Sequence, residues 1–362
     1  MPDITILPDD LRAAVAAGRL TEAQAASLTA LAQERLSVRQ SMSADEEPFE
    51  LFRGFAEVFI SVGLVVLLVG VAGVSVVLQN PTMIFLACIA ACVLLAMYFT
   101  RVRRMVLPSI VLVCGYAAAI AGLIGWFMVQ RAGTRLMEGA TLRPDQEMLM
   151  TLAAVGVGLL IWYRVFRVPF TVFLIGLVGL GIVIVISLRL TGLPFAEWQS
   201  LFNLQNGSGL AIGTLVFGIL ALIAGTWFDT RDPHRVGRAS AAGFWLHLLA
   251  APAIVNTLGQ TAMNSDGTAR YIYMVVSLVA ITLLALVLDR RSFLTAAIGY
   301  FAWLIWMLTR QNGEGLDLPV VFILIGSAVT ALGAGWTPMR SAVMRALPDF
   351  PGKDRLPPYR TA

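Results

Sequence analysis

Ionisable side chains are rare in the long apolar stretches of this sequence, and the few exceptions are the residues whose types could do chemistry. His247 lies well inside the apolar segment 240–258, too deep for its ring to reach the membrane surface easily. A polar ring at that depth is expected to face a neighbouring helix or a hydrated cavity. The structural interpretation is a hydrogen bond to a neighbouring helix, and the functional alternative is proton transfer or ligand binding.

Two further residues of the same segment bear on that choice. Pro252 removes a backbone donor and Asn256 adds a side-chain amide one turn later, so this pair is the expected place for a broken helix. The other histidine, His234, lies in a loop, and no cysteine or carboxylate stands at ligand spacing from His247. We therefore expect no metal site, and no motif for a cofactor occurs.

The segment just before His247 carries a dense mixture of charges. Its charged residues are Asp229, Arg231, Asp232, Arg235 and Arg238. Arginines in this arrangement can hold an anionic lipid headgroup or a phosphorylated ligand through charge-assisted contacts. The alternative is an ordinary basic loop whose charges pair with one another, as other turns of the chain have a similar basic composition.

Glu57 is the acid closest to the interior of an expected span. It lies about one turn inside the apolar segment 55–78. A charge at the centre of a bilayer costs at least about 2.5 kcal/mol, so an acid is kept there only for a reason. We expect Glu57 to be solvated or locally paired, and the functional alternative is an acid that couples to an ion.

The composition shows which elements must position these residues. Of 362 residues, 58% are hydrophobic and only 13% are charged, whereas soluble domains have about 25% charged residues. A helix needs about 20 apolar residues to cross a bilayer. The predicted fold is an all-α, polytopic transmembrane helical bundle of about ten spans, at 55–78, 82–100, 105–129, 147–163, 168–188, 208–228, 240–258, 271–288, 292–309 and 318–336.

Basic residues alternate between the two ends of these expected spans. The N-terminal segment, every second turn and the C-terminal tail together hold 20 of the 26 lysines and arginines. Because basic loops stay in the cytoplasm, both termini are predicted to be cytoplasmic. The basic residues form small clusters and no continuous stripe, so binding of nucleic acid is not expected. The expected domains are a cytoplasmic segment at 1–50, a membrane domain at 51–338 and a tail at 339–362.

Residues 9–40 have the pattern of a small helical hairpin. Asp9 or Asp10 is expected to cap its first helix, and Gly18 is expected to end that helix. Thr21 and Gln24 have the spacing of a capping box for the second helix. A hairpin of this size needs a partner surface, so we expect self-association, packing on the membrane domain, or a protein partner.

Two segments carry a resemblance to a known group of proteins. They are L-R-A-A-V-A-A-G-R-L-T-E-A-Q-A-A-S-L at 11–28, and F-D-T-R-D-P-H-R-V-G-R at 228–238 followed by F-W-L-H-L-L-A-A-P at 244–252. The first resembles the N-terminal hairpin, a domain of unknown function, of bacterial multi-pass membrane proteins, and the second resembles a recurring segment of proteobacterial membrane proteins. The resemblance implies a bacterial inner-membrane protein with a cytoplasmic hairpin, and it implies no activity.

Three classes of function are consistent with this sequence. The first is a transporter-like carrier of a small or lipid-like substrate, with its pathway near His247 and Pro252. The second is a non-catalytic membrane scaffold or sensor that docks a partner through the N-terminal hairpin. The third, an enzyme acting on lipid-linked substrates, is disfavoured because no acid and base are expected to converge on one face.

Overall fold

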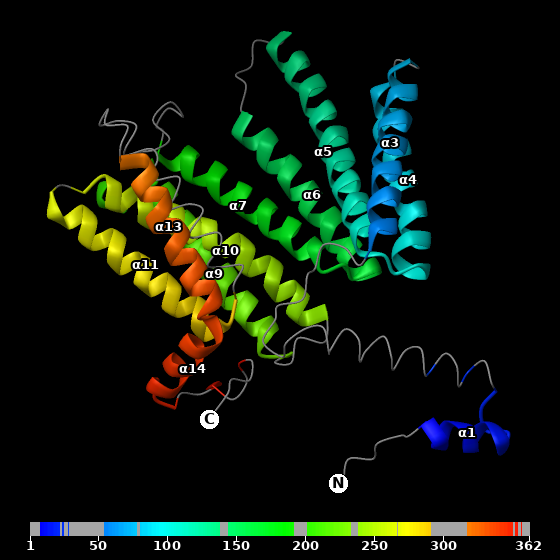
Figure 1. The fold of residues 1–362 in the computed structure, drawn as a ribbon. Coiled ribbons are helices and arrows are strands. Elements are labelled where there is room, and N and C mark those ends of the chain that lie inside the picture. The colour runs from blue at the N-terminus through cyan, green and yellow to red at the C-terminus, as the bar shows by residue number, and fades with distance from the viewer. Residues whose placement is uncertain are drawn as a thin grey trace. The chain divides into compact units, whose positions relative to one another are not determined.

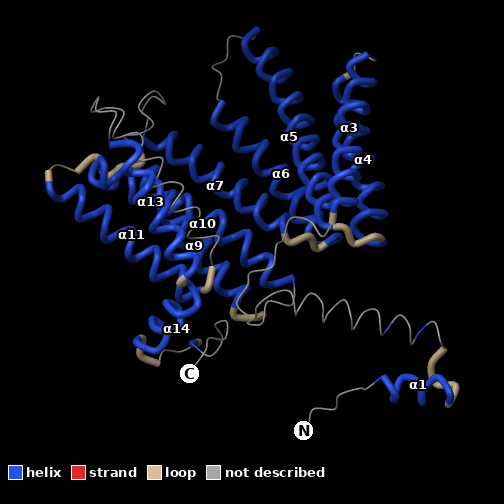
Figure 2. The backbone as a smooth tube through the Cα atoms, viewed as in Figure 1, coloured by secondary structure: helices blue, strands red, loops and turns tan. Residues whose placement is uncertain are grey.

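Most of the expected spans are helices in the structure. The computed structural model describes residues 8–21, 24, 28, 54–77, 80–137, 144–191, 201–232, 238–265, 267–290, 317–349, 352–353 and 356. Figure 2 shows helices and loops, and no strand, among these residues. A helix makes its backbone hydrogen bonds within its own segment, as a chain in hydrocarbon requires.

Figure 1 shows the helices coloured along the chain. In chain order they are α1 (Pro8–Ala16), α3 (Phe55–Val77), α4 (Pro81–Ala96) with the π-helical extension η1 (Met97–Val102), α5 (Val106–Met137), α6 (Pro144–Phe166), α7 (Phe170–Thr191), the short 3-10 helix η3 (Leu204–Asn206), α9 (Gly209–Asp229), α10 (Arg238–Met263), α11 (Thr268–Leu288), α13 (Asp317–Ala334) and α14 (Trp336–Ala346).

Seven of these helices are long and apolar enough to cross a membrane. They are α3, α4 with η1, α5, α6, α7, α9 and α10. In α11, the apolar stretch Val275–Leu288 is shorter. The expected span at 292–309 lies outside the described residues. The fold is therefore a multi-pass helical membrane domain, and the expected number of about ten spans stays a prediction.

The chain divides into two compact units, Met1–Pro48 and Phe49–Ala362. In the first unit, α1 ends as expected at Gly18, whose φ of +67° is left-handed. The amide of Arg19 donates to the carbonyl of Ala14 at 2.9 Å, which closes the end of the helix. The expected N-cap is wrong, because α1 already begins at Pro8 and both Asp9 and Asp10 lie inside it.

The expected capping box between Thr21 and Gln24 is present. The amide of Thr21 donates to Oε1 of Gln24 at 3.0 Å, and the amide of Gln24 donates to Oγ1 of Thr21 at 3.2 Å. These reciprocal bonds satisfy two amides that a helix start would otherwise leave unpaired. Residues 29–40 lie outside the described residues, so the complete hairpin stays a prediction.

In the second unit, α10 is the most buried of the membrane-crossing helices. In its most apolar stretch 72% of the residues are buried, against at most 33% in the other six. It packs against α9, α7 and α11. Figure 1 shows α9 and α10 running side by side. Small residues such as Ala250, Ala251 and Ala285 fill the core here, which lets these helix axes approach closely.

The helices α3 to α7 share a second core, built from larger side chains. Trp162 of α6 lies at its centre, with the rings of Tyr116 and Phe166 at centroid distances of 4.6 and 4.5 Å. The outward faces of α3 to α7 carry exposed valine, leucine and phenylalanine side chains. A membrane-spanning helix requires such a surface where it meets lipid.

Candidate functional site

Charged side chains gather inside the protein where α9 ends and α10 begins. Asp229 is the last residue of α9 and His247 lies in the N-terminal half of α10, and both are almost fully buried. Nε2 of His247 lies 2.9 Å from Oδ2 of Asp229. The expected hydrogen bond from His247 to a neighbouring helix is therefore confirmed, and its partner is a carboxylate.

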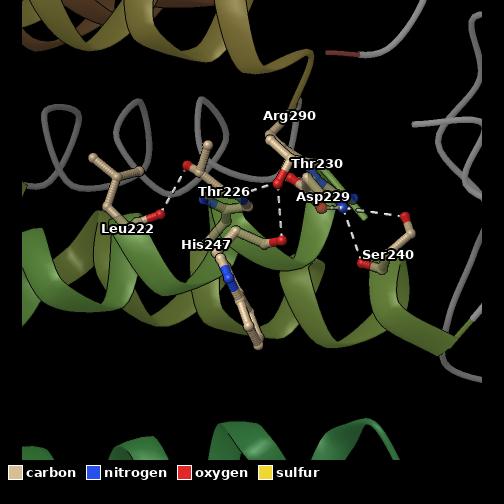
Figure 3. Close-up of polar contacts among 8 residues, drawn as sticks. Leu222, Thr226, Asp229, Thr230, Ser240, His247 and Arg290 are labelled. Atoms are coloured by element: carbon tan, nitrogen blue, oxygen red, sulfur yellow. Dashed lines mark hydrogen bonds and ion pairs between the residues drawn. The ribbon is translucent and has the colours of Figure 1, made fainter. Parts of the chain in front are cut away.

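Arg290 completes this contact from a distant part of the sequence. It follows α11, is only 1% exposed, and points its guanidinium at Asp229 (Figure 3). Its Nε donates to Oδ2 of Asp229 at 3.1 Å, and a terminal nitrogen donates to Oδ1. The same terminal nitrogen donates to the carbonyl oxygen of Ser240 at 2.9 Å. Three helical segments are thus tied together by one two-pronged ion pair.

Two glycines make room for the cluster between α9 and α10. A Cβ atom on Gly243 would lie 2.3 Å from Oδ1 of Asp229, and one on Gly225 would lie 3.0 Å from the ring of His247. Neither distance is compatible with a side chain at the glycine unless the neighbouring group moves. The two glycines therefore allow the carboxylate and the imidazole to lie directly against the facing helix.

A second buried ion pair begins at the residue next to Arg290. Asp289 ends α11 in a left-handed conformation, with a φ of +54°. Its Oδ1 accepts a hydrogen bond from Nε1 of Trp336 at 2.8 Å and lies 3.5 Å from Nε of Arg340. Trp336 and Arg340 both belong to α14, so this pair fixes α14 to the end of α11.

The charges of these two pairs balance. Two carboxylates, Asp229 and Asp289, face two guanidiniums, Arg290 and Arg340, and each of the four side chains is at most 7% exposed. Buried ions are tolerated when they are paired and hydrogen-bonded, and removing one partner leaves an uncompensated charge. These four side chains and His247 therefore form a structural clamp between helices, and we call these five residues the clamp.

The geometry offers little to catalysis or metal binding. The Oγ of Ser240 accepts a hydrogen bond from a terminal nitrogen of Arg290 at 3.2 Å. Nucleophilic catalysis would instead require this hydroxyl to bond to the imidazole of His247. Among the described residues, no group of three histidine, cysteine or acidic side chains is placed to hold a metal ion.

Glu57 caps a helix. Its Oε2 accepts hydrogen bonds from the backbone amides of Val106 and Leu107, both at 3.1 Å, and these are the first residues of α5. A carboxylate there satisfies two amides that lack a partner within the helix and faces the positive end of the helix dipole. Of the two expected states, solvated or locally paired, Glu57 is paired, and its partners belong to a different helix, α5.

Pro252 and Asn256 do not break α10. The helix is continuous from Arg238 to Met263 and contains both residues, so the expected interruption is wrong. Pro252 is exposed at the surface of the described protein, which leaves its ring free of crowding by a neighbouring helix. Pro252 and Asn256 follow His247 in α10 by five and nine residues, and neither takes part in the contacts of Asp229 described above.

The loop after α9 is only partly described. The guanidinium of Arg231 stacks over the ring of Trp227, 3.6 Å from its centroid, and the amide of Asp232 donates to the carbonyl of Asp229 at 3.0 Å. Arg235 lies outside the described residues. Of the loop charges, Asp229 therefore turns inward into the clamp and Arg231 lies against an aromatic ring at the surface.

Three residues of the clamp, Asp289, Arg290 and Arg340, were not singled out from the sequence. In the sequence, Asp289 and Arg290 form one of the short charged turns and Arg340 falls in the segment 339–362, so their composition does not set them apart. The available signal was an aspartate at the end of an apolar span followed at once by an arginine; after α9 the corresponding aspartate, Asp229, is followed two residues later by Arg231. The pairing itself joins residues 61 positions apart, which spacing along the chain does not reveal.

The helices and their apolar outer faces define a multi-pass integral membrane protein. Comparisons of this chain with protein-family models, curated proteins and solved structures find no match.

Proposed function

We propose that this protein is a non-catalytic membrane scaffold or sensor that docks a partner through its N-terminal unit. One observation carries the proposal: the ionisable residues best placed for transport are used to hold helices together. Glu57 caps α5, and Asp229 joins His247 to Arg290. A carrier has to expose such groups to its substrate or coupling ion, whereas a scaffold needs a fixed membrane domain.

The unit that would dock a partner is Met1–Pro48. Its described part contains helix α1, the closed helix end at Gly18 and the capping box of Thr21 and Gln24. We infer that residues 9–40 form a hairpin whose apolar stripe packs on another copy or on a different protein. The acidic linker after it, S-M-S-A-D-E-E-P, is polar enough to let the unit reach a partner.

A transporter-like carrier of a small substrate is the second candidate, and one cluster favours it. Oγ1 of Thr214 and Oγ1 of Thr257 lie 2.9 Å apart between α9 and α10. One turn further along α10, the side-chain nitrogen of Gln260 is buried without a hydrogen-bond partner. An unpaired buried donor is costly, so a polar solute or a water that accepts from it would stabilise the protein.

We further propose a topology of about ten spans in a bacterial inner membrane, with both termini in the cytoplasm. The distribution of 20 of 26 basic residues supports it, because one missed or added span would reverse every later turn. Helices α3 to α11 and α13 correspond to nine of the ten expected spans, and these provide further support.

Cross-linking in native membranes tests the scaffold. The full chain should give a cross-linked complex of defined mass, and a chain lacking residues 1–45 should lose it while remaining in the membrane with an unchanged Tm. A His247→Asn variant should keep the complex and show a lower Tm. The proposal fails if the complex survives the deletion, or if no complex forms.

A separate measurement tests the carrier. In a substrate screen with proteoliposomes, a carrier would accumulate a solute that a Gln260→Leu variant does not accumulate. That variant should keep its Tm, because it removes an unpaired donor. Solute uptake that depends on Gln260 and persists without residues 1–45 would favour the carrier over the scaffold.

A further inference from the structure

We propose that the turn after α4 and the turn between α6 and α7 together form a binding surface for the headgroups of anionic phospholipids. The surface consists of five exposed arginines, which we call the five-arginine surface: Arg101, Arg103, Arg104, Arg164 and Arg167. It is separate from the buried ion pair in which Asp229, at the end of α9, and Arg290, after α11, neutralise each other.

One hydrogen bond joins the two turns. A terminal nitrogen of Arg101 donates to the carbonyl oxygen of Val165 at 3.3 Å, across 64 positions of sequence. Each turn contains an arginine in the left-handed region, Arg104 with a φ of +52° and Arg167 with a φ of +54°. Figure 1 shows that these turns lie at the same end of α4, α5, α6 and α7. Two small basic clusters of the sequence are thus one surface.

The positive charge of this surface is not compensated within the described protein. None of the five arginines forms an ion pair with a described residue, whereas the buried Arg290 and Arg340 each face an aspartate. Glu57 lies near the first of these turns, but it is buried and accepts hydrogen bonds from the amides of Val106 and Leu107 at the start of α5. The guanidiniums are therefore available to an anion from outside the chain.

Apolar side chains between the arginines favour a lipid over a free anion. Val102 is 68% exposed and Val165 is 44% exposed, and each stands among the arginines at the end of a membrane-spanning helix. Such residues would contact acyl chains while the guanidiniums contact the phosphate above them. Inorganic phosphate could pair with the guanidiniums, but it has no acyl chain to contact Val102 and Val165.

Native mass spectrometry of the detergent-purified full chain tests the proposal, with phosphatidylglycerol and phosphatidylcholine as probes. The wild type should bind phosphatidylglycerol preferentially. A triple variant, Arg101→Gln, Arg104→Gln and Arg167→Gln, should lower that affinity by between about tenfold and about a hundredfold, because each basic residue near an anionic surface contributes up to about fivefold. It keeps Arg103 and Arg164, which help to preserve the membrane orientation.

The matched control removes three exposed arginines elsewhere: Arg19→Gln, Arg131→Gln and Arg345→Gln. Its net charge equals that of the first variant, and it should bind phosphatidylglycerol like the wild type. Equal losses in both triple variants would overturn the proposal. So would competition by millimolar inorganic phosphate together with no preference for phosphatidylglycerol over phosphatidylcholine, since this would identify a free-anion site.

A measurement on the wild type keeps the proposal testable if the first triple variant does not fold. A photoreactive phosphatidylglycerol added to the full chain in nanodiscs should cross-link to peptides that contain residues 97–105 or 163–169. Cross-links confined to other turns would contradict the assignment. Cross-linking should also weaken as salt is raised, because the guanidiniums are exposed.

Discussion

At the scale of single residues, burial distinguishes charged side chains that stabilise the fold from charged side chains that contribute little to its stability. Asp229 and Arg290 form their ion pair with almost no exposure, whereas Asp145 and Arg189 form theirs at 3.2 Å with exposed fractions of 31% and 49%. Water and ions screen the exposed pair and leave the buried one unscreened. The same chemical contact should therefore have very different effects on stability.

An Asp229→Asn variant should lower the free energy of unfolding by about 3–5 kcal/mol, because it leaves the guanidinium of Arg290 buried without a carboxylate. The matched variant Asp145→Asn breaks the exposed pair and should cost about 0–1 kcal/mol. Thermal unfolding of the purified proteins measures both. Equal Tm values for the two variants would show that the buried pair is not a clamp.

A Gly243→Ala variant tests the close approach of α9 and α10. The new Cβ would lie 2.3 Å from Oδ1 of Asp229 and 3.1 Å from the carbonyl oxygen of Gly225, so the helices must separate, at a cost of about 1–3 kcal/mol. Gly63→Ala on α3 is the control, because no atom lies within 4 Å of its new Cβ. It should leave the Tm unchanged or raise it, since alanine favours helix.

At the scale of elements, polar residues stabilise this fold at the ends of its helices. Glu57 of α3 caps α5, Asn80 accepts a hydrogen bond from the amide of Met83 at the start of α4, and Asp289 ends α11. Helix ends leave backbone groups unpaired, and near a membrane few waters can replace a lost partner. The caps should therefore influence how well each helix end is held.

A Glu57→Ala variant should cost about 0.5–2 kcal/mol and loosen the start of α5, because the amides of Val106 and Leu107 lose their acceptor. Glu57→Gln keeps an oxygen acceptor and should cost less. Hydrogen exchange of peptides covering residues 104–110 measures the effect, with the exposed Asp349→Asn as control. Unchanged exchange in Glu57→Ala would rule out the cap.

At the scale of the whole molecule, the arrangement of basic residues determines the predicted orientation. The five-arginine surface and the C-terminal segment after α14 belong to the same predicted side, and 20 of the 26 basic residues lie there. Arginines near span ends resist transfer across the membrane, so their positions predict topology without any knowledge of packing.

Reporter fusions check this prediction at both ends of the chain. A reporter that is active only in the cytoplasm, fused before Met1 or after Ala362, should be active in both fusions. The same reporter inserted after Gly139, in the connection between α5 and α6, should be inactive. Activity at only one terminus would require an odd number of spans and would refute the topology.

The amino-acid sequence by itself determined the class of this protein and the local features of its elements. The apolar runs and the scarcity of charge predict membrane helices, and the left-handed end at Gly18 and the capping box of Thr21 and Gln24 were also readable. These features depend on residues close together in the chain, and local sequence determines them directly. The predicted break of α10 at Pro252 failed because packing on α7, α9 and α11 holds that helix through the proline.

Only the tertiary structure decided what the polar residues contact. It placed Arg290 against Asp229, Glu57 on α5, and the turn after α4 against the turn between α6 and α7. Each of these contacts joins positions at least 49 apart, and it depends on which helices become neighbours. All the apolar spans prefer lipid to a similar degree, so hydropathy does not determine which helices become neighbours. Small residues and buried ion pairs determine it, and these contacts can be identified only once the helices are packed.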